Sequence, residues 1–352
     1  MNRKDIIDLA RSGLRMPIGA DLVLRGHADA ESIVTDGARL GGVILEAAAR
    51  FRTPLAVGLM DLTLEKGAVL DLAGIAPEDA AAHHLDAWPG DHLPGLVDDE
   101  TRPLSPRMQA HVDAVRHVAA AGGVVPVGMV IGPFSLMTKF LADPIMPVFL
   151  AGAGVGAEDD PSVDLAQRLL DLSTRMVLRG ARAQLRAGAR VLVVAEPAAN
   201  SVFISPRQME EGSDVFERWV MEPNRLLRAL LRDAGDAQLF FHCCGDVTPA
   251  MLRGFAALDP AVLSLGGSRR LWEDAPLVPE TTVLFGNLPT KSFYSDEVMP
   301  ESRVVELAGE IVGRMAATGH PHILGSECDV LSVPGREAAI LAKVDAFLNS
   351  PA

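Results

Sequence analysis

The sequence predicts an α/β protein that folds as a distorted (β/α)8 TIM barrel with an N-terminal extension and long loops. Short runs rich in Val, Ile and Leu recur between amphipathic helical stretches, as expected for parallel strands that are buried on both faces. Several runs end in a polar or reactive residue, and barrels of this class build their active sites at the carboxyl ends of strands. No Gly-rich phosphate loop follows any run, which disfavours a doubly wound nucleotide-binding sheet.

The expected elements alternate along the chain. An eighth strand is expected near the N-terminus, in the segment Met16–Leu22. The seven clearer strands are expected at Leu55–Met60, Val125–Ile131, Val191–Ala195, Leu239–Phe241, Val262–Leu265, Val283–Phe285 and His322–Leu324. Helices are expected at Asp164–Ala187, Glu222–Ala234, Pro249–Leu258, Ser302–Thr318 and Arg336–Leu348. This alternation of strands and helices favours a barrel.

We expect a single domain over residues 1–352, with a helical N-terminal extension over 1–50 and the barrel over 51–352. The polar stretch Asp86–Pro106 is interpreted as an ordered loop or small cap. Val118–Thr138 contains no Asp, Glu, Lys or Arg, but its glycines and prolines interrupt it. It is therefore predicted to be a helix end, a Gly-Gly turn, a buried strand and a loop, and not a membrane span.

The charge balance excludes two classes of partner. The 352 residues include 32 Lys and Arg against 46 Asp and Glu, so the formal net charge is −14. Binding to nucleic acid or to an anionic membrane is therefore not expected. The N-terminal residues form no apolar segment of signal-peptide length, so we expect a cytoplasmic protein.

All three cysteines follow expected strands, which suggests a metal site. His242 and Cys244 are two residues apart at one strand end, so an extended chain presents both on the same face. Cys328 follows another strand. Two cysteines and one histidine form a known catalytic zinc set that leaves the fourth position open. The alternative is that these cysteines are small buried apolar residues, which is our interpretation of Cys243.

At these motifs the chain resembles the uroporphyrinogen decarboxylase superfamily, and in particular its zinc-dependent branch of corrinoid-linked methyltransferases, which includes methylcobalamin:coenzyme M methyltransferase. The resemblance covers nearly the whole chain. It is carried by Asp61–Glu65, Gly132–Ser135, Glu196-Pro197, Ile204–Pro206, His242–Gly245, Gly286-Asn287 and Gly325–Cys328.

The resemblance implies a distorted (β/α)8 barrel in which His242, Cys244 and Cys328 bind Zn²⁺. It also implies transfer of a methyl group between a corrinoid, such as methylcobalamin, and a small thiol or a methyl ether or alcohol. The chain has no Asp-x-His-x-x-Gly corrinoid signature. The corrinoid is therefore expected to arrive free or on a corrinoid-binding partner protein.

Two alternatives belong to other functional classes. The first is a decarboxylase acting on a tetrapyrrole or related acid. The true decarboxylases carry an Arg-Gln-Ala-Gly-Arg motif near the N-terminus and a tyrosine in the active site. The segment Arg15–Asp21 lacks the motif, and Tyr294, the only tyrosine in this chain, is hard to match to the active-site tyrosine. The second alternative is a non-catalytic binding module that uses its thiols for redox chemistry or a structural metal. A structural zinc normally has four protein ligands, and only three candidates are visible.

Five further residues are candidates for the same site. Glu196 and Asp61 are candidate catalytic carboxylates. The alternative for Glu196 is a solvated or helix-capping carboxylate, and the alternative for Asp61 is a cap on the following helix. Asn287 is a candidate for substrate binding, with a turn role after Gly286 as its alternative. Phe134 and Ser135 are expected to shape the rim of the site, with Ser135 as a helix N-cap.

Overall fold

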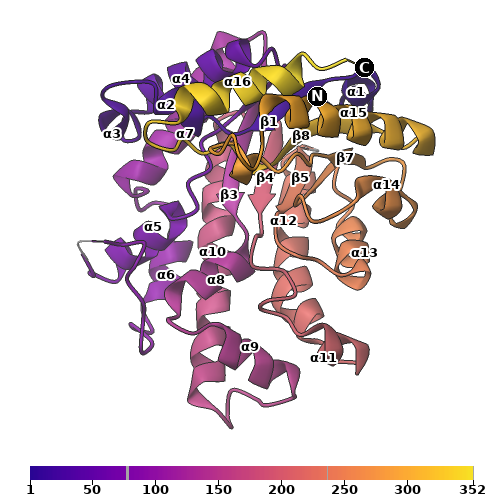
Figure 1. Cartoon of the computed structure of the whole chain (residues 1–352). Coiled ribbons are helices and arrows are strands. Elements are labelled where there is room, and N and C mark those ends of the chain that lie inside the picture. The colour runs from indigo at the N-terminus through magenta and orange to yellow at the C-terminus, as the bar shows by residue number, and fades with distance from the viewer. Residues whose placement is uncertain (77–78, 236, 352) are drawn as a thin grey trace.

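Eight parallel strands form a nearly closed barrel at the centre of the molecule (Figure 1). A computed structural model describes residues 1–76, 79–235 and 237–351. The strands are ordered β1-β8-β7-β6-β5-β4-β3-β2, so sequence neighbours are also spatial neighbours from β2 to β8. The predicted TIM barrel is therefore confirmed. The strands are β1 (Arg15–Ile18), β2 (Leu55–Val57), β3 (Val125–Ile131), β4 (Val191–Ala195), β5 (Gln238–Cys243), β6 (Val262–Leu265), β7 (Val283–Phe285) and β8 (His322–Asp329).

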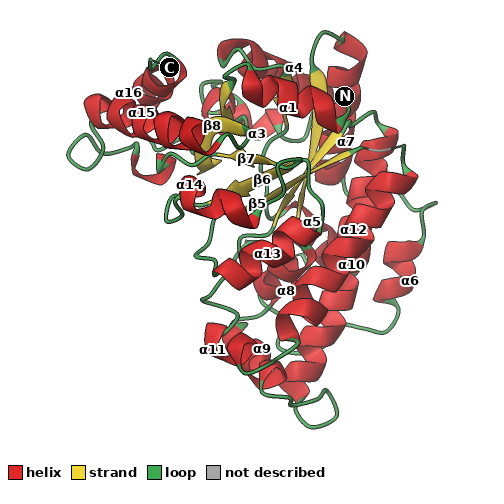
Figure 2. Cartoon of the chain, turned by 90° about the vertical axis from the view of Figure 1, so that its right-hand side faces the viewer, coloured by secondary structure: helices red, strands yellow, loops and turns green. Residues whose placement is uncertain are grey.

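Helices surround the strands and fill the connections between them (Figure 2). A π-helical turn spans Glu217–Met221, and 3-10 turns span Ala275–Leu277 and Thr290–Ser292. The helices are α1 (Arg3–Arg11), α2 (Asp21–Leu24), α3 (Ala30–Ile33), α4 (Gly37–Arg50), α5 (Leu64–Leu72), α6 (Leu93–Asp98), α7 (Pro106–Ala121), α8 (Pro133–Phe140), α9 (Ile145–Gly152), α10 (Pro161–Arg186), α11 (Pro206–Glu210), α12 (Glu222–Asp233), α13 (Pro249–Ala257), α14 (Leu271–Asp274), α15 (Glu301–Thr318) and α16 (Glu337–Leu348).

Four of these helices begin with the same local chemistry. A polar side chain at the N-cap accepts a backbone N–H of the first turn, and proline occupies the first helical position. Proline is suited to this position because its missing N–H would have no partner inside the helix. The capping residues are Ser105, Asp160, Ser205 and Thr248.

The N-terminal strand lies within the segment expected to be a helical extension. β1 spans Arg15–Ile18 and pairs with β8, whereas the predicted strand extended to Leu22. It ends earlier because Asp21–Leu24 already forms α2. Residues 1–50 therefore contribute one barrel strand as well as helices.

The segment after β3 corrects one expectation. It was predicted to be a loop, but Pro133–Phe140 forms α8. Gly132 is the N-cap and Pro133 starts the first turn, so Ser135 lies inside the helix and is not its cap. The helix is stabilised by burial, because Phe134 and Leu136 are fully inaccessible to solvent.

The expected cap over Asp86–Pro106 contains the short helix α6.

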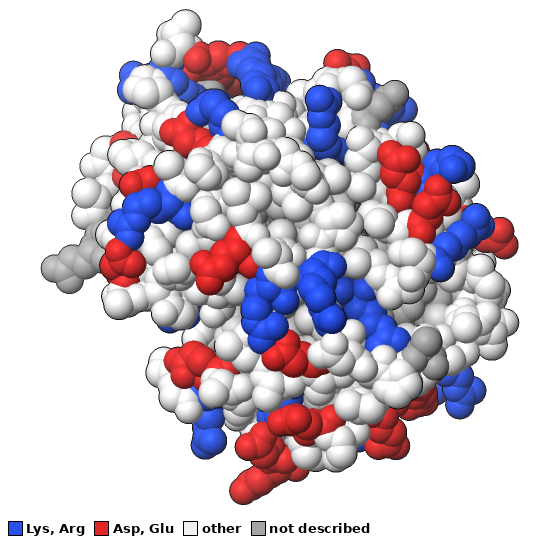
Figure 3. Space-filling view, turned by 90° about the horizontal axis from the view of Figure 1, so that it is seen from above, with Lys and Arg blue, Asp and Glu red and all other residues white. Residues whose placement is uncertain are grey.

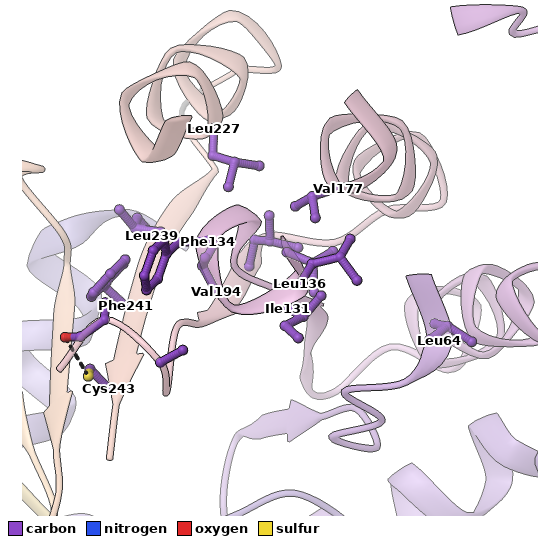
Figure 4. Packing of buried hydrophobic residues seen from close by; sticks show 14 of the residues in the cluster. Leu64, Ile131, Phe134, Leu136, Val177, Val194, Leu227, Leu239, Phe241 and Cys243 are labelled. Atoms are coloured by element: carbon purple, nitrogen blue, oxygen red, sulfur yellow. Dashed lines mark hydrogen bonds between the residues drawn. The ribbon is translucent and has the colours of Figure 1, made fainter. Parts of the chain in front are cut away.

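The apolar core has two parts, one on each side of the sheet. The inner part contains residues of all eight strands and includes Val193, Phe240 and Ile323, while Ile6 of α1 packs against them. The outer part packs the alternate strand residues against the helices. Figure 4 shows this for β5, where Leu239, Phe241 and Cys243 lie among the labelled apolar side chains of the outer part. Burial on both faces explains why the strands contain so few polar residues.

Charged side chains of both signs are interspersed on the face seen from above (Figure 3). Among the residues that the structure describes, no helix combines the length and apolarity needed to cross a membrane.

Candidate metal centre

The first two candidate ligands lie at the end of β5. Phe240 packs in the barrel interior, whereas Phe241 and Cys243 face the helices. Because strand side chains alternate, His242 and Cys244 follow the inward direction of Phe240. His242 is 1% exposed and Cys244 is half-buried. Cys243 is fully buried, and its Sγ lies 3.5 Å from the carbonyl oxygen of Ala199, which confirms its predicted place in the core (Figure 4).

The pairing of β8 with β1 is irregular next to Cys328. Ile323 lies in the barrel interior, so uniform alternation would place Cys328 on the opposite face. Met16 is opposite Gly325 and Ile18 is opposite Asp329, so β8 has two more residues than β1 between these pairs. An irregularity of this kind can redirect side chains, and Cys328 lies close to His242 and Cys244 of β5 and the loop after it.

The ligand atoms of His242, Cys244 and Cys328 all lie within 4.8 Å of one another. No other group of three or more His, Cys, Asp or Glu side chains with this geometry occurs in the described part of the chain. Two thiols and an imidazole form a donor set that suits Zn²⁺. A possible metal-binding site is therefore present at the strand ends.

The imidazole of His242 is oriented as a metal ligand would be. Its Nδ1 is 2.9 Å from Oγ of Ser264, the residue paired with it on the neighbouring strand β6. Its Nε2 is buried and has no hydrogen-bond partner. An unpartnered buried nitrogen is costly, and binding of a metal at Nε2 would satisfy it. The residues therefore fit a zinc ion.

The two thiols titrate as a pair. The pKa of Cys244 is lowered to about 3, mainly by the hydrogen bond from Cys328 and also by His242, although burial acts to raise it. The same contact raises the pKa of Cys328, because the charge on Cys244 opposes a second ionisation. Metal binding would offset this repulsion and allow both sulfurs to be thiolates.

Lys291 was not predicted from the sequence, and it places a positive charge beside the two sulfurs. Burial lowers the pKa of Lys291, but the charges of Cys244, Glu327 and Cys328 raise it overall. The lysine lies in the turn after β7, where Glu327 accepts the N–H of Lys291 at 3.3 Å and that of Gly267 at 3.0 Å. Glu327, which precedes Cys328, therefore connects two loops to the strand that carries the third candidate ligand.

Glu196 lies outside the metal group and is fully buried. Its Oε1 accepts the N–H of Ser135 at 2.6 Å, and Nδ2 of Asn224 is 3.4 Å from its Oε2. Burial raises the pKa of Glu196 to about 7, although the contacts with Ser135 and Asn224 act to lower it. These contacts match the helix-capping interpretation, because the carboxyl group meets the first turn of α8.

Asp61 and Asn287 also bind neighbouring backbone or charged groups. Oδ1 of Asp61 accepts the backbone N–H of Thr63 at 3.0 Å, and its Oδ2 is 2.7 Å from Arg107. Nδ2 of Asn287 donates to the carbonyl oxygens of Gly266 and Arg269, each at 2.8 Å. Both side chains thus stabilise loops at strand ends.

Phe134 and Ser135 are buried in the helical layer. The ring of Phe134 packs edge-on against Phe203 with centroids 6.5 Å apart. Ser135 accepts the N–H of Ala198 through Oγ at 2.9 Å. These two contacts connect α8 to the loop after β4.

The model of the uroporphyrinogen decarboxylase family matches residues 95–334, about two thirds of the sequence. The chain belongs to the uroporphyrinogen decarboxylase family. Among solved structures it is similar to a methyltransferase from Methanosarcina mazei, with a TM-score of 0.67 and 16% sequence identity over 99% of this chain and 98% of that chain. No curated protein sequence matches the chain significantly. The structural likeness supports the barrel fold.

Proposed function

We propose that this member of the uroporphyrinogen decarboxylase family is a zinc-dependent methyltransferase. It would move a methyl group between a corrinoid and a small thiol or a methyl ether or alcohol. The observation that carries the proposal is the grouping of the unpartnered Nε2 of His242 with the sulfurs of Cys244 and Cys328. Three protein ligands leave one zinc position for a substrate atom, as in catalytic zinc sites.

Bound zinc would lower the pKa of a substrate thiol, or polarise the oxygen of an ether or alcohol. The protein would supply geometry and charge. Ser264 would hold the ring of His242 through its contact with Nδ1, and Cys244 and Cys328, as thiolates, would give the centre two negative charges. Lys291 balances part of that charge. Both cysteines are only half-buried, so the centre is open to a substrate.

Two further points support the methyltransferase proposal over other chemistries of the family. The similar structure from Methanosarcina mazei is described as a methyltransferase. The arginine-rich segment expected of porphyrinogen decarboxylases is missing around Arg15–Asp21. Because the chain contains no corrinoid signature, a corrinoid-binding protein is the partner we propose.

The remaining sequence candidates stay predictions. Glu196 and Asp61 are predicted as catalytic carboxylates, and Asn287, Phe134 and Ser135 as residues that contact substrate. The contacts of these five side chains position loops and α8 around the centre. Substitutions at these positions should therefore be examined for zinc retention before activity is compared.

The test combines metal analysis with a methyl-transfer assay. Purified protein should contain about one zinc per chain. Cys244→Ser and Cys328→Ser should lose zinc, while Cys243→Ser should keep it. Full zinc retention in both ligand variants would refute the site. Methylcobalamin and a panel of small thiols should yield a methyl thioether only when the zinc-loaded protein is present. The opposite direction is tested with methanol or methyl ethers and reduced cobalamin, which should yield methylcobalamin.

Because the chain belongs to this family, a second candidate function is decarboxylation of a tetrapyrrole or related acid. Incubation with uroporphyrinogen followed by mass spectrometry distinguishes the decarboxylase from the methyltransferase. Loss of carbon dioxide units that does not depend on zinc would support the decarboxylase and contradict the methyltransferase proposal.

A further inference from the structure

A basic cavity lies on the outer helical layer, away from the metal centre. It has a volume of about 310 Å³ and is formed by α7, α10 and the segment 100–104. The two helices also contact one another directly, and α6 runs beside α10 (Figure 2). None of the cavity's lining residues belongs to the metal group. Its charged walls consist of one glutamate and five arginines: Glu100, Arg102, Arg116, Arg179, Arg182 and Arg186.

Arg179 brings a buried positive charge to this cavity. It is 7% exposed, and its guanidinium donates to the carbonyl oxygens of Leu96 at 3.1 Å, Val97 at 3.0 Å and Arg102. No carboxylate lies within ion-pair distance of it in the described residues. Burial lowers the pKa of its guanidinium. Buried charges are normally paired, so this arginine lacks the anion that such a position favours.

Three of the other four arginines leave further positive charge uncompensated, whereas Arg116 is paired with Asp113. Arg182 and Arg186 share the single carboxylate of Glu100, at 2.7 and 2.8 Å. Arg102 is exposed and forms no ion pair among the residues for which positions are given. This excess is notable in a chain whose net charge is −14, because most of its other arginines form ion pairs with acidic side chains.

We propose that the cavity binds a small phosphate-bearing anion. Planar guanidinium groups match phosphate oxygens in paired hydrogen bonds, and several of them around one pocket favour a multiply charged ligand. The volume is at the lower end of the range for small-molecule sites. The ligand lies over Arg179 and is contacted from the rim by Arg102. Glu100 competes with it for Arg182 and Arg186.

Calorimetric titration with inorganic pyrophosphate tests the proposal on the full chain. Arg102→Gln should weaken binding about tenfold, because it removes a charge-assisted contact. Glu100→Gln should strengthen binding, because it releases two arginines. Neither side chain contributes to the core, so both variants should fold like wild type by circular dichroism.

Matched controls separate a specific site from general charge effects. Arg253→Gln removes an exposed arginine on α13, and Glu211→Gln frees Arg207, its ion-pair partner on α11. Both controls should leave pyrophosphate affinity unchanged. The proposal is overturned if wild type does not bind pyrophosphate, if Arg102→Gln binds like Arg253→Gln, or if citrate binds as tightly as pyrophosphate.

Discussion

Replacing Ser264 by alanine removes the hydroxyl that orients the ring of His242. If Nε2 binds zinc, that nitrogen presents its lone pair and Nδ1 carries the proton. Oγ of Ser264, 2.9 Å away, is the acceptor for this N–H. Both residues are almost completely buried, at 1% and 0% exposure, so water does not replace the lost oxygen.

The size of the effect follows from this geometry. A buried donor left without an acceptor costs about 1 to 3 kcal/mol, and about 1.4 kcal/mol corresponds to a tenfold change in a binding constant. We therefore expect Ser264→Ala to bind zinc about 5 to 100 times more weakly than wild type. Loss of an outer hydrogen bond to a metal-ligating histidine commonly has an effect of this size.

A chelator-competition titration at fixed pH measures this zinc affinity. Ser173→Ala is the matched control, because Ser173 is equally buried on α10 and its hydroxyl has no hydrogen-bond partner. The control should bind zinc like wild type. Equal zinc affinity in Ser264→Ala and Ser173→Ala would refute the reasoning, since it would show that Ser264 does not hold His242 for the metal.

Three further perturbations test the surroundings of the site. Burial raises the pKa of Glu65 to about 8 from the ordinary value of 4.5, so the folded protein keeps a proton that the unfolded chain releases. Stability should therefore fall as pH rises from about 4.5 to 8. In denaturant unfolding at pH 9, Glu65→Gln should be more stable than wild type by about 5 kcal/mol at most, and at pH 4 the two should be equally stable. In metal-free protein, Cys244 should react with iodoacetamide at a nearly constant rate from pH 5 to 8, because its pKa is near 3; a tenfold rise per pH unit, as in an ordinary thiol, would contradict this. In thermal unfolding, Gly132→Ala should destabilise the protein by about 3 kcal/mol or more, because the added Cβ would lie 1.3 Å from Oε2 of Glu196. Gly67→Ala is the control and should be neutral or stabilising, because Gly67 lies on α5 with open space around its Cβ position.

The strands were predictable because their sequence signal is local. Each clear strand is a short run of apolar residues, and burial on both faces of a parallel sheet requires that pattern. The start of α8 was misplaced because its apolar residues directly follow β3, and Gly132 and Pro133 look like loop residues in isolation. In the structure the same two residues start a helix.

The grouping of His242, Cys244 and Cys328 was predictable from their places at strand ends, but the residues around them were not. His242 and Cys244 share a face by simple alternation. Ser264 lies within an apolar strand, and only the register of β5 with β6 places it opposite His242. Cys328 lies next to an irregularity in the pairing of β8 with β1, which no local sequence pattern indicates. Lys291 lies in an irregular turn, where no periodic pattern indicates which way a side chain points.

Zinc K-edge X-ray absorption, recorded before and after addition of a thiol that is methylated in the assay, tests the central claim most directly. The proposal predicts two sulfur ligands at about 2.3 Å and one imidazole nitrogen at about 2.0 to 2.1 Å in the purified protein, with a third sulfur after the thiol is added. A sulfur count that does not change with such a thiol, or zinc absent from the protein, would contradict the assignment of His242, Cys244 and Cys328 as an open catalytic centre.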